Sequence, residues 1–320
     1  MKPLTKAETA RYLLEHDHYV IVTHRRPDGD TLGSAATLCR GLRQLGKSAH
    51  ILHNPEVTPK YLPLMEGLTT DVPVTNGIIV AVDVASANML PQSFSSVVEH
   101  IDLRIDHHRT GDSFSELELV EPSAAACGQI IYDLLTEMGA TLDVPMANAL
   151  YTAISTDTGC FRYANTQTHT FEVAAACAQA GAELPELNRI LFETNSLARM
   201  RIQGWMVENA RFVSDGQICI CAIPLEVEQQ LGVTEDDMEN ISGVPRSIDG
   251  VKIAATLRQE KDTGKIKLSV RALPGYDASA ICAQFGGGGH RGAAGASIAM
   301  SMDEAVQALI KAFPLIGMDN

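Results

Sequence analysis

The chain has 320 residues and a formal net charge of −14, with 45% hydrophobic and 20% charged residues. This length predicts two domains with a sizeable core. The negative charge argues against binding of long DNA or RNA, which needs many Lys and Arg contacts with phosphates, but small phosphorylated ligands stay open. Because we find no apolar run that could span a bilayer and no signal-peptide pattern, we expect a cytoplasmic protein without a membrane partner.

The first half of the chain alternates short β-rich runs with helical patterns. Tyr19–Thr23 is predicted to be a buried strand, and a helix follows from about Thr31 to Leu45. Three further strands are predicted at Ser48–Leu52, Gly77–Val82 and Ile101–Ile105. Strands that alternate with helices indicate an α/β fold, so we predict a doubly wound, mainly parallel sheet in a first domain at 1–186. Helical patterns dominate later in this half, including Val144–Ser155 and Thr168–Ala180.

The pattern changes after a helical connector predicted at 187–211. Strands are expected at Gln217–Ile223, Val251–Arg258, Lys265–Ala272 and Gly295–Ala299, and the middle two are expected to pair. Helices are expected at Asp277–Phe285 and Met302–Ala312, with Ser301 as the N-cap of the second. We therefore predict a second, smaller α/β domain at 212–320.

Acidic and histidine side chains follow the predicted strands and one further apolar run of the first domain. They are His24, Asp28 and Asp30 after the first strand, Asp83 after the third, Asp106, His107 and His108 after the fourth, and Asp157 after the run Ala149–Ile154. Ligands of doubly wound sheets bind outside the carboxyl ends of the strands, so we expect these groups to converge. So many carboxylates repel one another unless divalent cations lie among them. Carboxylates combined with imidazoles favour Mn²⁺, with Mg²⁺ as the second choice.

A simpler interpretation exists for single members of this set. An Asp after a strand is often only the N-cap of the next helix, and Asp30 and Asp157 could be caps of this kind. His24 by itself is more often a structural histidine than a ligand. Capping alone hardly accounts for four acidic clusters, two of which contain His, so we favour the metal interpretation.

Four glycines precede His290 in the run Gly286–His290. We expect this run to form neither helix nor strand, because ordering glycines costs much conformational entropy. Its backbone N–H groups suit close approach to a ligand, and a flexible linker is the alternative. In the preceding strand, Ile266, Leu268 and Val270 alternate with Lys265, Lys267, Ser269 and Arg271, so the first three are expected in the core. For the two Lys residues we expect only a solvated face.

Taken in order, these motifs resemble those of the DHH phosphoesterase superfamily. The motifs are His24-x-x-x-Asp28-x-Asp30, Asp83, Asp106-His107-His108 and Asp157-Thr-Gly, followed by a glycine run, Phe285–Gly295, that is similar to the signature of the associated nucleotide-binding domain. The resemblance spans nearly the whole chain, and the layout is that of the compact nanoRNase and pAp phosphatase subgroup. It is also the sole ground for considering a homodimer.

The resemblance implies roles for individual residues. His24 and Asp28 would hold one metal ion, and Asp30, His107 and Asp157 would hold a second. Asp83 would bridge both ions. Asp106 would orient a histidine, and His108 would face the scissile phosphate as a donor or proton-transfer group.

The resemblance also implies substrate contacts. Arg271 and His290 would grip a terminal nucleotide, with the backbone of Gly288 and Gly289 beside it. Arg109 would add a phosphate contact, unless it is only a surface residue, and Arg162 is a further candidate. Two stretches depart from the resemblance and bear on substrate preference: Gly111 stands where relatives often carry Asn, and Ala125–Gln129 where they tend to have Ser-Thr and then Glu.

The activity implied is Mn²⁺-dependent hydrolysis of short oligoribonucleotides from the 3′ end, together with hydrolysis of 3′-phosphoadenosine 5′-phosphate (pAp). Phosphodiester cleavage of cyclic di-AMP or its linear product is the alternative. An inorganic pyrophosphatase is disfavoured, because it needs a clamp rich in Lys and Arg rather than a glycine run. A nucleotide sensor without activity would be expected to lack metal ligands, which are all present here.

Overall fold

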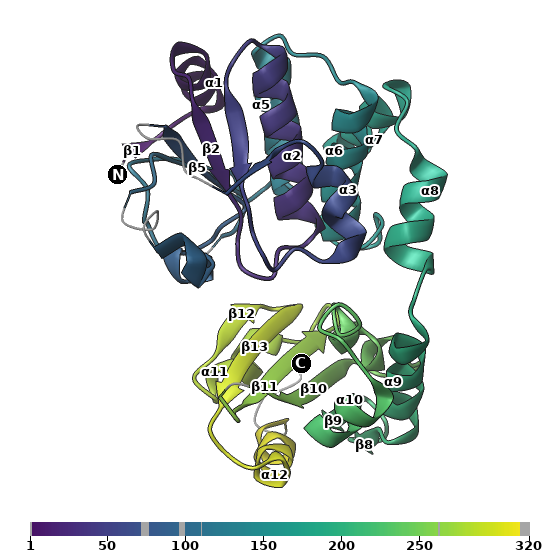
Figure 1. The fold of residues 1–320 in the computed structure, drawn as a ribbon. Coiled ribbons are helices and arrows are strands. Elements are labelled where there is room, and N and C mark those ends of the chain that lie inside the picture. The colour runs from purple at the N-terminus through teal and green to yellow at the C-terminus, as the bar shows by residue number, and fades with distance from the viewer. Residues whose placement is uncertain (1, 72–76, 96–99, 110, 262, 314–320) are drawn as a thin grey trace. The chain divides into compact units, whose positions relative to one another are not determined.

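The computed structural model describes residues 2–71, 77–95, 100–109, 111–261 and 263–313. The chain divides into two compact units, Met1–Thr194 and Asn195–Asn320 (Figure 1). Among the described residues, no helix combines the length and the apolar character that crossing a membrane requires.

The first unit is built on a seven-stranded sheet with the order β1-β7-β6-β5-β2-β3-β4. All of its pairs are parallel, which confirms the predicted α/β fold. The strands are β1 (Lys2–Pro3), β2 (Tyr19–Val22), β3 (Ala49–Leu52), β4 (Thr69–Thr70), β5 (Ile78–Val82), β6 (Leu103–Asp106) and β7 (Leu117–Val120). The sequence did not reveal β1, β4 and β7.

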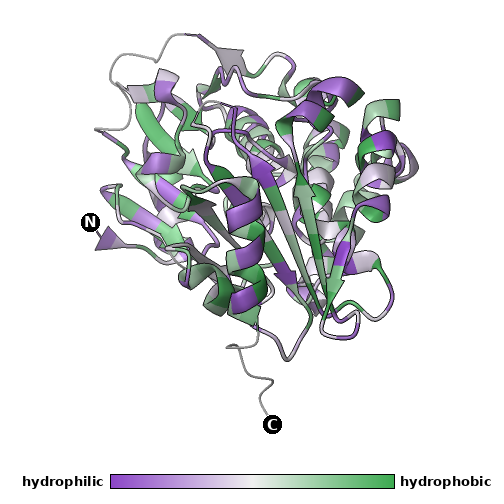
Figure 2. Ribbon diagram, turned by 90° about the horizontal axis from the view of Figure 1, so that it is seen from below, coloured by the Kyte–Doolittle hydropathy of each residue, from purple (hydrophilic) through white to green (hydrophobic). Residues whose placement is uncertain are grey.

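The interior strand β2, next to the central strand β5, is covered on both faces. Tyr19 and Ile21 belong to one hydrophobic core, and Val20 and Val22 belong to another. Helices α1 (Lys6–Glu15), α2 (Gly29–Gln44) and α5 (Cys127–Glu137) contribute to the first of these cores. A parallel strand buried on both faces reads as a continuous apolar run, which is why the sequence predicted it. Figure 2 shows helices along which purple hydrophilic and green hydrophobic residues alternate.

The other helical segments among the described residues of this unit connect and flank the sheet. They are η1 (Pro59–Tyr61), α3 (Leu62–Met65), η2 (Ala87–Met89), η3 (Gln92–Phe94), α6 (Val144–Asp157), α7 (Thr168–Gln179), α8 (Leu184–Asn188) and η4 (Arg189–Glu193). Asp157 therefore ends a helix, whereas most of the other candidate ligands lie at or just beyond strand ends.

Neither Asp30 nor Asp157 is the N-cap of its own helix, which was the simpler interpretation of both residues. Helix α2 begins at Gly29, and its N-cap is Asp28, whose Oδ1 accepts the N–H groups of Asp30 and Thr31 at 3.0 and 3.2 Å. Asp157 lies at the C-terminal end of α6, where no N-cap exists. The carboxyl groups of Asp30 and Asp157 must therefore be accounted for in another way.

Helices α2 and α6 approach closely because glycine faces the contact. A Cβ added at Gly33 would lie 2.3 Å from the carbonyl oxygen of Ala149, and one added at Gly29 would lie 2.4 Å from Oγ1 of Thr156. Both distances are far below van der Waals contact, so side chains here would push the helices apart. The glycines thereby let the end of α6 lie beside the start of α2.

The second unit contains a six-stranded sheet with the order β12-β13-β11-β10-β9-β8. Only the β9–β10 pair is parallel among these strands. Its elements are α9 (Leu197–Glu208), β8 (Arg211–Val213), β9 (Ile218–Ile223), α10 (Leu225–Leu231), η5 (Ile241–Gly243), η6 (Pro245–Ser247), β10 (Ile253–Gln259), β11 (Ile266–Ala272), α11 (Ala278–Ala283), β12 (Gly288–His290), β13 (Ala293–Ile298) and α12 (Met302–Ala312).

Several predictions for this unit are confirmed. Strands β10 and β11 pair in antiparallel fashion, and Ile266, Leu268 and Val270 lie in the core. Ser301 caps α12, with its Oγ accepting the N–H of Glu304 at 3.3 Å.

The prediction that the run Gly286–His290 forms neither helix nor strand is wrong for its last three residues. Gly288–His290 forms strand β12, which pairs with β13 at the edge of the sheet. The ladder to β13 supplies hydrogen-bond partners that offset the entropy cost of ordering glycine, a tertiary effect that the local sequence does not reveal.

Candidate metal centre

The candidate ligands meet near the ends of β2 and β5. From these two neighbouring strands, later strands are added toward opposite edges of the sheet. Strand β2 lies between β3 and β5, and the chain proceeds outward in both directions from there. His24 lies two residues after β2, Asp83 follows β5, and Asp106 ends β6. Ligands of open parallel sheets bind at this kind of switch point, beyond the carboxyl ends of the strands.

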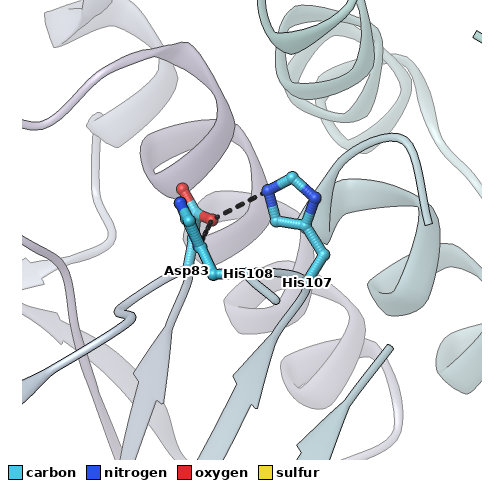
Figure 3. A group of neighbouring side chains, drawn as sticks. All are labelled: Asp83, His107 and His108. Carbon is cyan, nitrogen blue, oxygen red and sulfur yellow. Dashed lines mark ion pairs between the residues drawn. The ribbon is translucent and has the colours of Figure 1, made fainter. Parts of the chain in front are cut away.

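Asp83 is the centre of the cluster. It is 2% exposed, and its Oδ1 has no hydrogen-bond partner within the described part of the chain. That oxygen lies 3.4 Å from Nε2 of His107 and 3.6 Å from Nδ1 of His108 (Figure 3). The other oxygen, Oδ2, lies 3.8 Å from Nε2 of His24. A buried carboxylate oxygen without a partner is costly, and a cation would relieve that cost.

All six predicted metal ligands come together around Asp83. Three groups offer ligand atoms within 4.8 Å of one another, namely His24 with Asp28 and Asp83, Asp30 with His107 and Asp157, and Asp83 with His107 and His108. The first two groups coincide with the two sets of ligands that the resemblance implied. Their donor atoms are carboxylate oxygens and imidazole nitrogens, a combination that fits a divalent cation such as Mn²⁺.

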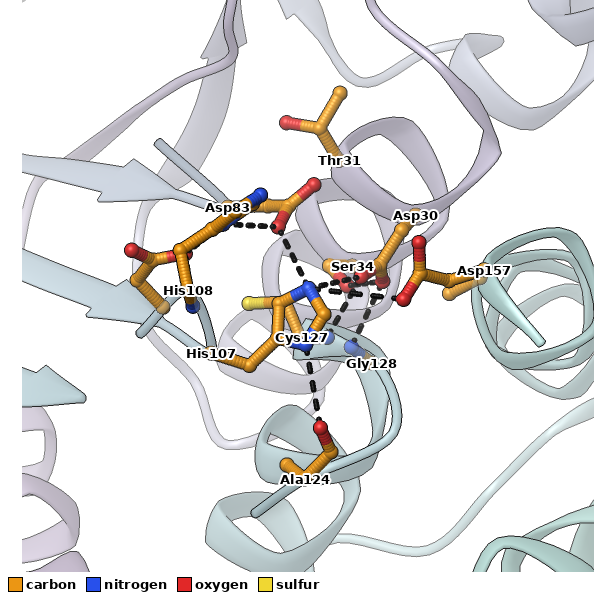
Figure 4. Close-up of polar contacts among 12 residues, drawn as sticks. Asp30, Thr31, Ser34, Asp83, His107, His108, Ala124, Cys127, Gly128 and Asp157 are labelled. Atoms are coloured by element: carbon orange, nitrogen blue, oxygen red, sulfur yellow. Dashed lines mark hydrogen bonds and ion pairs between the residues drawn. The ribbon is translucent and has the colours of Figure 1, made fainter. Parts of the chain in front are cut away.

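Asp30 is held by a helix other than its own. Its Oδ2 accepts the N–H of Cys127 at 2.7 Å, and its Oδ1 accepts the N–H of Gly128 at 3.0 Å (Figure 4). Ser34 donates its hydroxyl to the same Oδ1 at 2.9 Å. Asp30 thus caps the N-terminus of α5. These partners were not predicted, although the stretch containing Cys127 and Gly128 stood out as a departure from the resemblance.

Backbone carbonyls orient two of the histidines. Nδ1 of His107 lies 3.2 Å from the carbonyl oxygen of Ala124, and Nδ1 of His24 lies 2.8 Å from that of Arg25. These contacts place the proton on Nδ1 and leave Nε2 of each ring to face the carboxylates, as metal-ligating histidines usually do.

Asp106 orients the third histidine. Its Oδ1 lies 2.7 Å from Nδ1 of His108, and its Oδ2 accepts a hydrogen bond from the buried guanidinium of Arg104. Burial alone would raise the pKa of Asp106, but the hydrogen bond from His108 and the charges of His108 and Arg104 hold it at about 2. Sequence reasoning missed Arg104, whose position two residues before Asp106 on one strand was the available signal.

The charges of the cluster are poorly balanced without a cation. Burial raises the pKa of Asp30 well above its usual range, and the nearby charge of Asp83 raises it further. Burial also raises the pKa of Asp157. Burial would lower the pKa of both histidines, but carboxylates around them outweigh it and raise the pKa of His24 to about 9 and that of His107 to about 11. The cluster therefore retains protons that a divalent cation would replace.

Three other side chains near the cluster differ in how they are held. Arg109 and Arg162 are both exposed, and Nε of Arg162 donates to the carbonyl oxygen of Gly159 at 2.5 Å. Asn165, which the sequence did not single out, donates to the carbonyl oxygens of Ala125 and Asp157 at 2.8 and 3.2 Å. Asn165 therefore ties the end of α6 to the segment that precedes α5.

The predicted nucleotide contacts of the second unit lie on one sheet. Arg271 on β11 and His290 on β12 are both in register with Ala293 on β13, which lies between them. Residues directly opposite on neighbouring strands share a face, so the two side chains start from the same face, about 10 Å apart across two strand spacings. Gly288 and Gly289 precede His290 on the same exposed strand.

Comparison with known proteins agrees with these observations. Residues 18–154 match the model of the DHH family, N-terminal domain, and residues 215–314 match the DHHA1 domain. The chain is 32% identical over 296 residues to the bifunctional oligoribonuclease and PAP phosphatase NrnA of Thermus thermophilus, covering 91% of this chain and 88% of that protein. The protein of the same name from Bacillus subtilis is 26% identical, with 94% of this chain and 95% of that protein covered.

A solved structure shares the fold over almost its full length. The crystal structure of an exopolyphosphatase-related protein from Bacteroides fragilis superimposes with a TM-score of 0.84 at 25% identity, and covers 97% of each chain. The chain belongs to the DHH family and is a metal-dependent hydrolase that acts on phosphoester bonds.

Proposed function

We propose that the chain hydrolyses short oligoribonucleotides from the 3′ end and removes the 3′-phosphate of pAp, using two Mn²⁺ ions. The observation that carries this proposal is the position of Asp83 between two sets of donors. Its Oδ2 faces His24 and its Oδ1 faces His107, at 3.8 and 3.4 Å. The choice of substrates is supported by the names of the relatives from Thermus thermophilus and Bacillus subtilis.

The three groups of neighbouring ligand atoms around Asp83 support a ligand assignment. His24 and Asp28 would hold one ion, Asp30, His107 and Asp157 would hold the other, and Asp83 would bridge the two. When bound, the two cations would acidify a water and offset the negative charge of the phosphoryl oxygens. Asp30 would be a fixed ligand, because three hydrogen bonds hold its carboxylate in place.

His108 would transfer a proton at the reacting phosphate. Its Nδ1 is hydrogen-bonded to Asp106 at 2.7 Å, so Nε2 is the atom that can exchange a proton with the substrate. Asp106 keeps the ring in one orientation and tautomer, the role that a buried carboxylate has beside a reactive histidine.

The second unit would select the end of a nucleotide chain. Arg271 would supply a cation, and His290 would supply an imidazole ring from the same face of the sheet. Gly288 and Gly289 would allow a base or a phosphate to approach the backbone of β12. Arg109 would add a phosphate contact. The cytoplasmic location and the homodimer stay predictions.

An activity panel tests the proposal. The purified chain is incubated with Mn²⁺ and, separately, with a dinucleotide, pAp, cyclic di-AMP, pyrophosphate and an RNA of about 50 nucleotides. We expect fast turnover of the dinucleotide and pAp, slow turnover of the other three, and no turnover of any after chelation of the metal. Rapid opening of cyclic di-AMP without action on the dinucleotide would replace the proposal by a cyclic dinucleotide phosphodiesterase.

A further inference from the structure

Arg104 is a buried arginine to which no role was assigned from the sequence. It lies on β6 two residues before Asp106, and residues so spaced on a strand point to the same face. The side chain of Arg104 is 4% exposed and that of Asp106 is 0% exposed. A guanidinium buried to this degree has lost its hydration, so it persists only where hydrogen-bond acceptors surround it.

Four groups surround the guanidinium. Nη2 donates to Oδ2 of Asp106, and Nη1 donates to the carbonyl oxygen of Asp112 at 3.2 Å. Glu118 is directly opposite on β7, with Oε2 3.6 Å from Nη1. The ring of Phe114 has its centroid 5.6 Å from Cζ. These contacts come from three segments of the chain and hold the guanidinium in one position.

The loop over Arg104 depends on glycine at position 111. A Cβ added there would lie 2.0 Å from the carbonyl oxygen of Ala85 and 3.1 Å from Nη2 of Arg104. The N–H of the next residue, Asp112, donates to that carbonyl oxygen at 3.1 Å. Gly111 is one of the positions where the sequence departs from the resemblance, and here it leaves room for the loop to close against Arg104.

We propose that Arg104 is a positioning residue for phosphoester hydrolysis, because it fixes the carboxylate of Asp106, which in turn fixes the imidazole of His108. Oδ1 of Asp106 contacts Nδ1 of His108 at 2.7 Å and accepts its backbone N–H at 3.3 Å, while Arg104 holds Oδ2. With both oxygens held, the carboxylate cannot rotate and the imidazole keeps one orientation. The proposal rests on the proposed function only for the part that His108 plays in the reaction.

The variants Arg104→Met and Arg104→Lys test this proposal. Their turnover of a dinucleotide and of bis(p-nitrophenyl) phosphate is measured together with Mn²⁺ affinity by calorimetry. We expect Arg104→Met to lower kcat about 10- to 100-fold, the usual effect of losing a residue that orients a site group, with KM and Mn²⁺ affinity within about twofold of wild type. Arg104→Lys, which keeps the charge, should recover part of the loss.

A control variant separates positioning from general stability. Arg258→Met removes the guanidinium from another ion pair, with Glu228 at 2.7 Å, and is expected to lower the unfolding midpoint while kcat is retained. The proposal is overturned if Arg104→Met keeps kcat within twofold. It is equally overturned if kcat, Mn²⁺ affinity and stability fall together and Arg104→Lys recovers none of them.

Two further measurements cover the remaining outcomes. If Arg104→Met does not fold, the variant Gly111→Ala is measured in its place. It keeps the charge of Arg104 but displaces the loop that packs against the guanidinium. A 10- to 100-fold loss of kcat in Gly111→Ala supports the proposal, and an unchanged kcat overturns it.

The downfield proton NMR signal of the His108 Nδ1–H in Mg²⁺-loaded protein should be lost in Arg104→Met, and its retention overturns the proposal. If wild type hydrolyses neither substrate, the proposed function fails, and this signal still decides the role of Arg104.

Discussion

Nε2 of His107 lies 3.4 Å from Oδ1 of Asp83, an oxygen with no hydrogen-bond partner in the described part of the chain. This oxygen and the Nε2 nitrogen of a largely buried imidazole face each other without a hydrogen bond between them, which is the arrangement that a shared divalent cation would stabilise. The first prediction concerns this pair.

Asp83→Asn should reduce Mn²⁺-dependent turnover to below about 1% of wild type, a larger loss than the 10- to 100-fold typical of residues that only orient a ligand. Asn is chosen because Asp83 has φ of 60°, a backbone conformation that Asn tolerates better than Ala. Asp215→Asn is the matched control, since Asp215 has φ of 52° and is exposed. Turnover near wild type in Asp83→Asn would contradict the bridging role.

Binding of Mn²⁺ to the metal-free protein should release protons. The pKa of His24 is raised to about 9 and that of His107 to about 11, so both rings are protonated at pH 7 and must lose a proton to bind a metal. Calorimetry in buffers of different ionisation enthalpy should give at least two protons released per protein at pH 7. Affinity should rise with pH about tenfold per unit for each proton released. Affinity independent of pH would contradict the ligand roles of these histidines.

The raised pKa values of these histidines also determine whether the stability of the metal-free protein rises or falls with pH. A histidine whose pKa is raised by folding stabilises the native state fully below its unfolded value of about 6.5 and loses this contribution as pH rises through its folded value. The unfolding midpoint of the metal-free protein should therefore fall as pH rises from about 6.5 to 9, where native His24 keeps a proton that the unfolded chain has lost. Saturating Mn²⁺ should remove this decline, which thermal unfolding with and without the metal can show.

Gly33→Ala should weaken both the fold and the metal site. The added methyl group would lie 2.3 Å from the carbonyl oxygen of Ala149, so α2 and α6 must separate at a cost of about 1–3 kcal/mol. Because α2 carries Asp30 and α6 ends at Asp157, Mn²⁺ affinity should fall as well. Urea unfolding and calorimetry measure the two effects.

The control for Gly33→Ala is a glycine variant that is expected to raise the stability of the protein. Gly204 lies inside α9, and an added Cβ there meets nothing within 4 Å. Gly204→Ala should stabilise the protein by about 0.5–1 kcal/mol, because alanine loses less entropy than glycine in a helix. Equal destabilisation by both variants would refute the packing argument for Gly33.

The variants Gly288→Ala and Gly289→Ala should have different effects. The first should weaken substrate binding, and the second should strain the backbone and lower stability. A Cβ at Gly288 meets nothing within 4 Å, so the variant should keep its stability and raise KM for a dinucleotide about tenfold, equivalent to about 1.4 kcal/mol of binding. Gly289 has φ of 144°, and its Cβ would lie 2.7 Å from the carbonyl oxygen of Ala293, so that variant should lose stability.

Arg271→Ala and His290→Ala should raise KM in the same way as Gly288→Ala while Mn²⁺ affinity is unchanged. Lys265→Ala, at an exposed position just before β11, serves as the control and should leave KM at the wild-type value. A KM effect confined to long RNA, with none on dinucleotides, would contradict the assignment of this surface to a nucleotide terminus.

Strands with strong apolar runs were predictable from sequence, whereas short or glycine-rich strands were not. Tyr19–Val22 and Ile78–Val82 each carry consecutive apolar residues because both faces of the sheet are covered. Strand β1 has two residues, and β12 has two glycines and one histidine, so their strand conformation depends on a neighbour. No local pattern encodes such a neighbour.

The candidate ligands were found because each follows a recognisable element, but the groups that hold them were not. Asp30 is held by the N–H groups of Cys127 and Gly128, about 100 positions further along the chain, and only the packing of α2 against α5 brings them together. The spacing of Arg104 and Asp106 on one strand was a signal for that pair, but the position of Glu118 opposite Arg104 is known only once the strand register is known.

The ligands of the candidate centre are spread from His24 to Asp157, and they are gathered by three strands and two helices. A growing chain on the ribosome therefore carries all the other candidate ligands before α6 has emerged to supply Asp157. The complete candidate site must therefore form late in synthesis, since a site assembled by tertiary contacts does not exist in the unfolded chain. Loading with metal would thus mark the moment at which the first unit has closed.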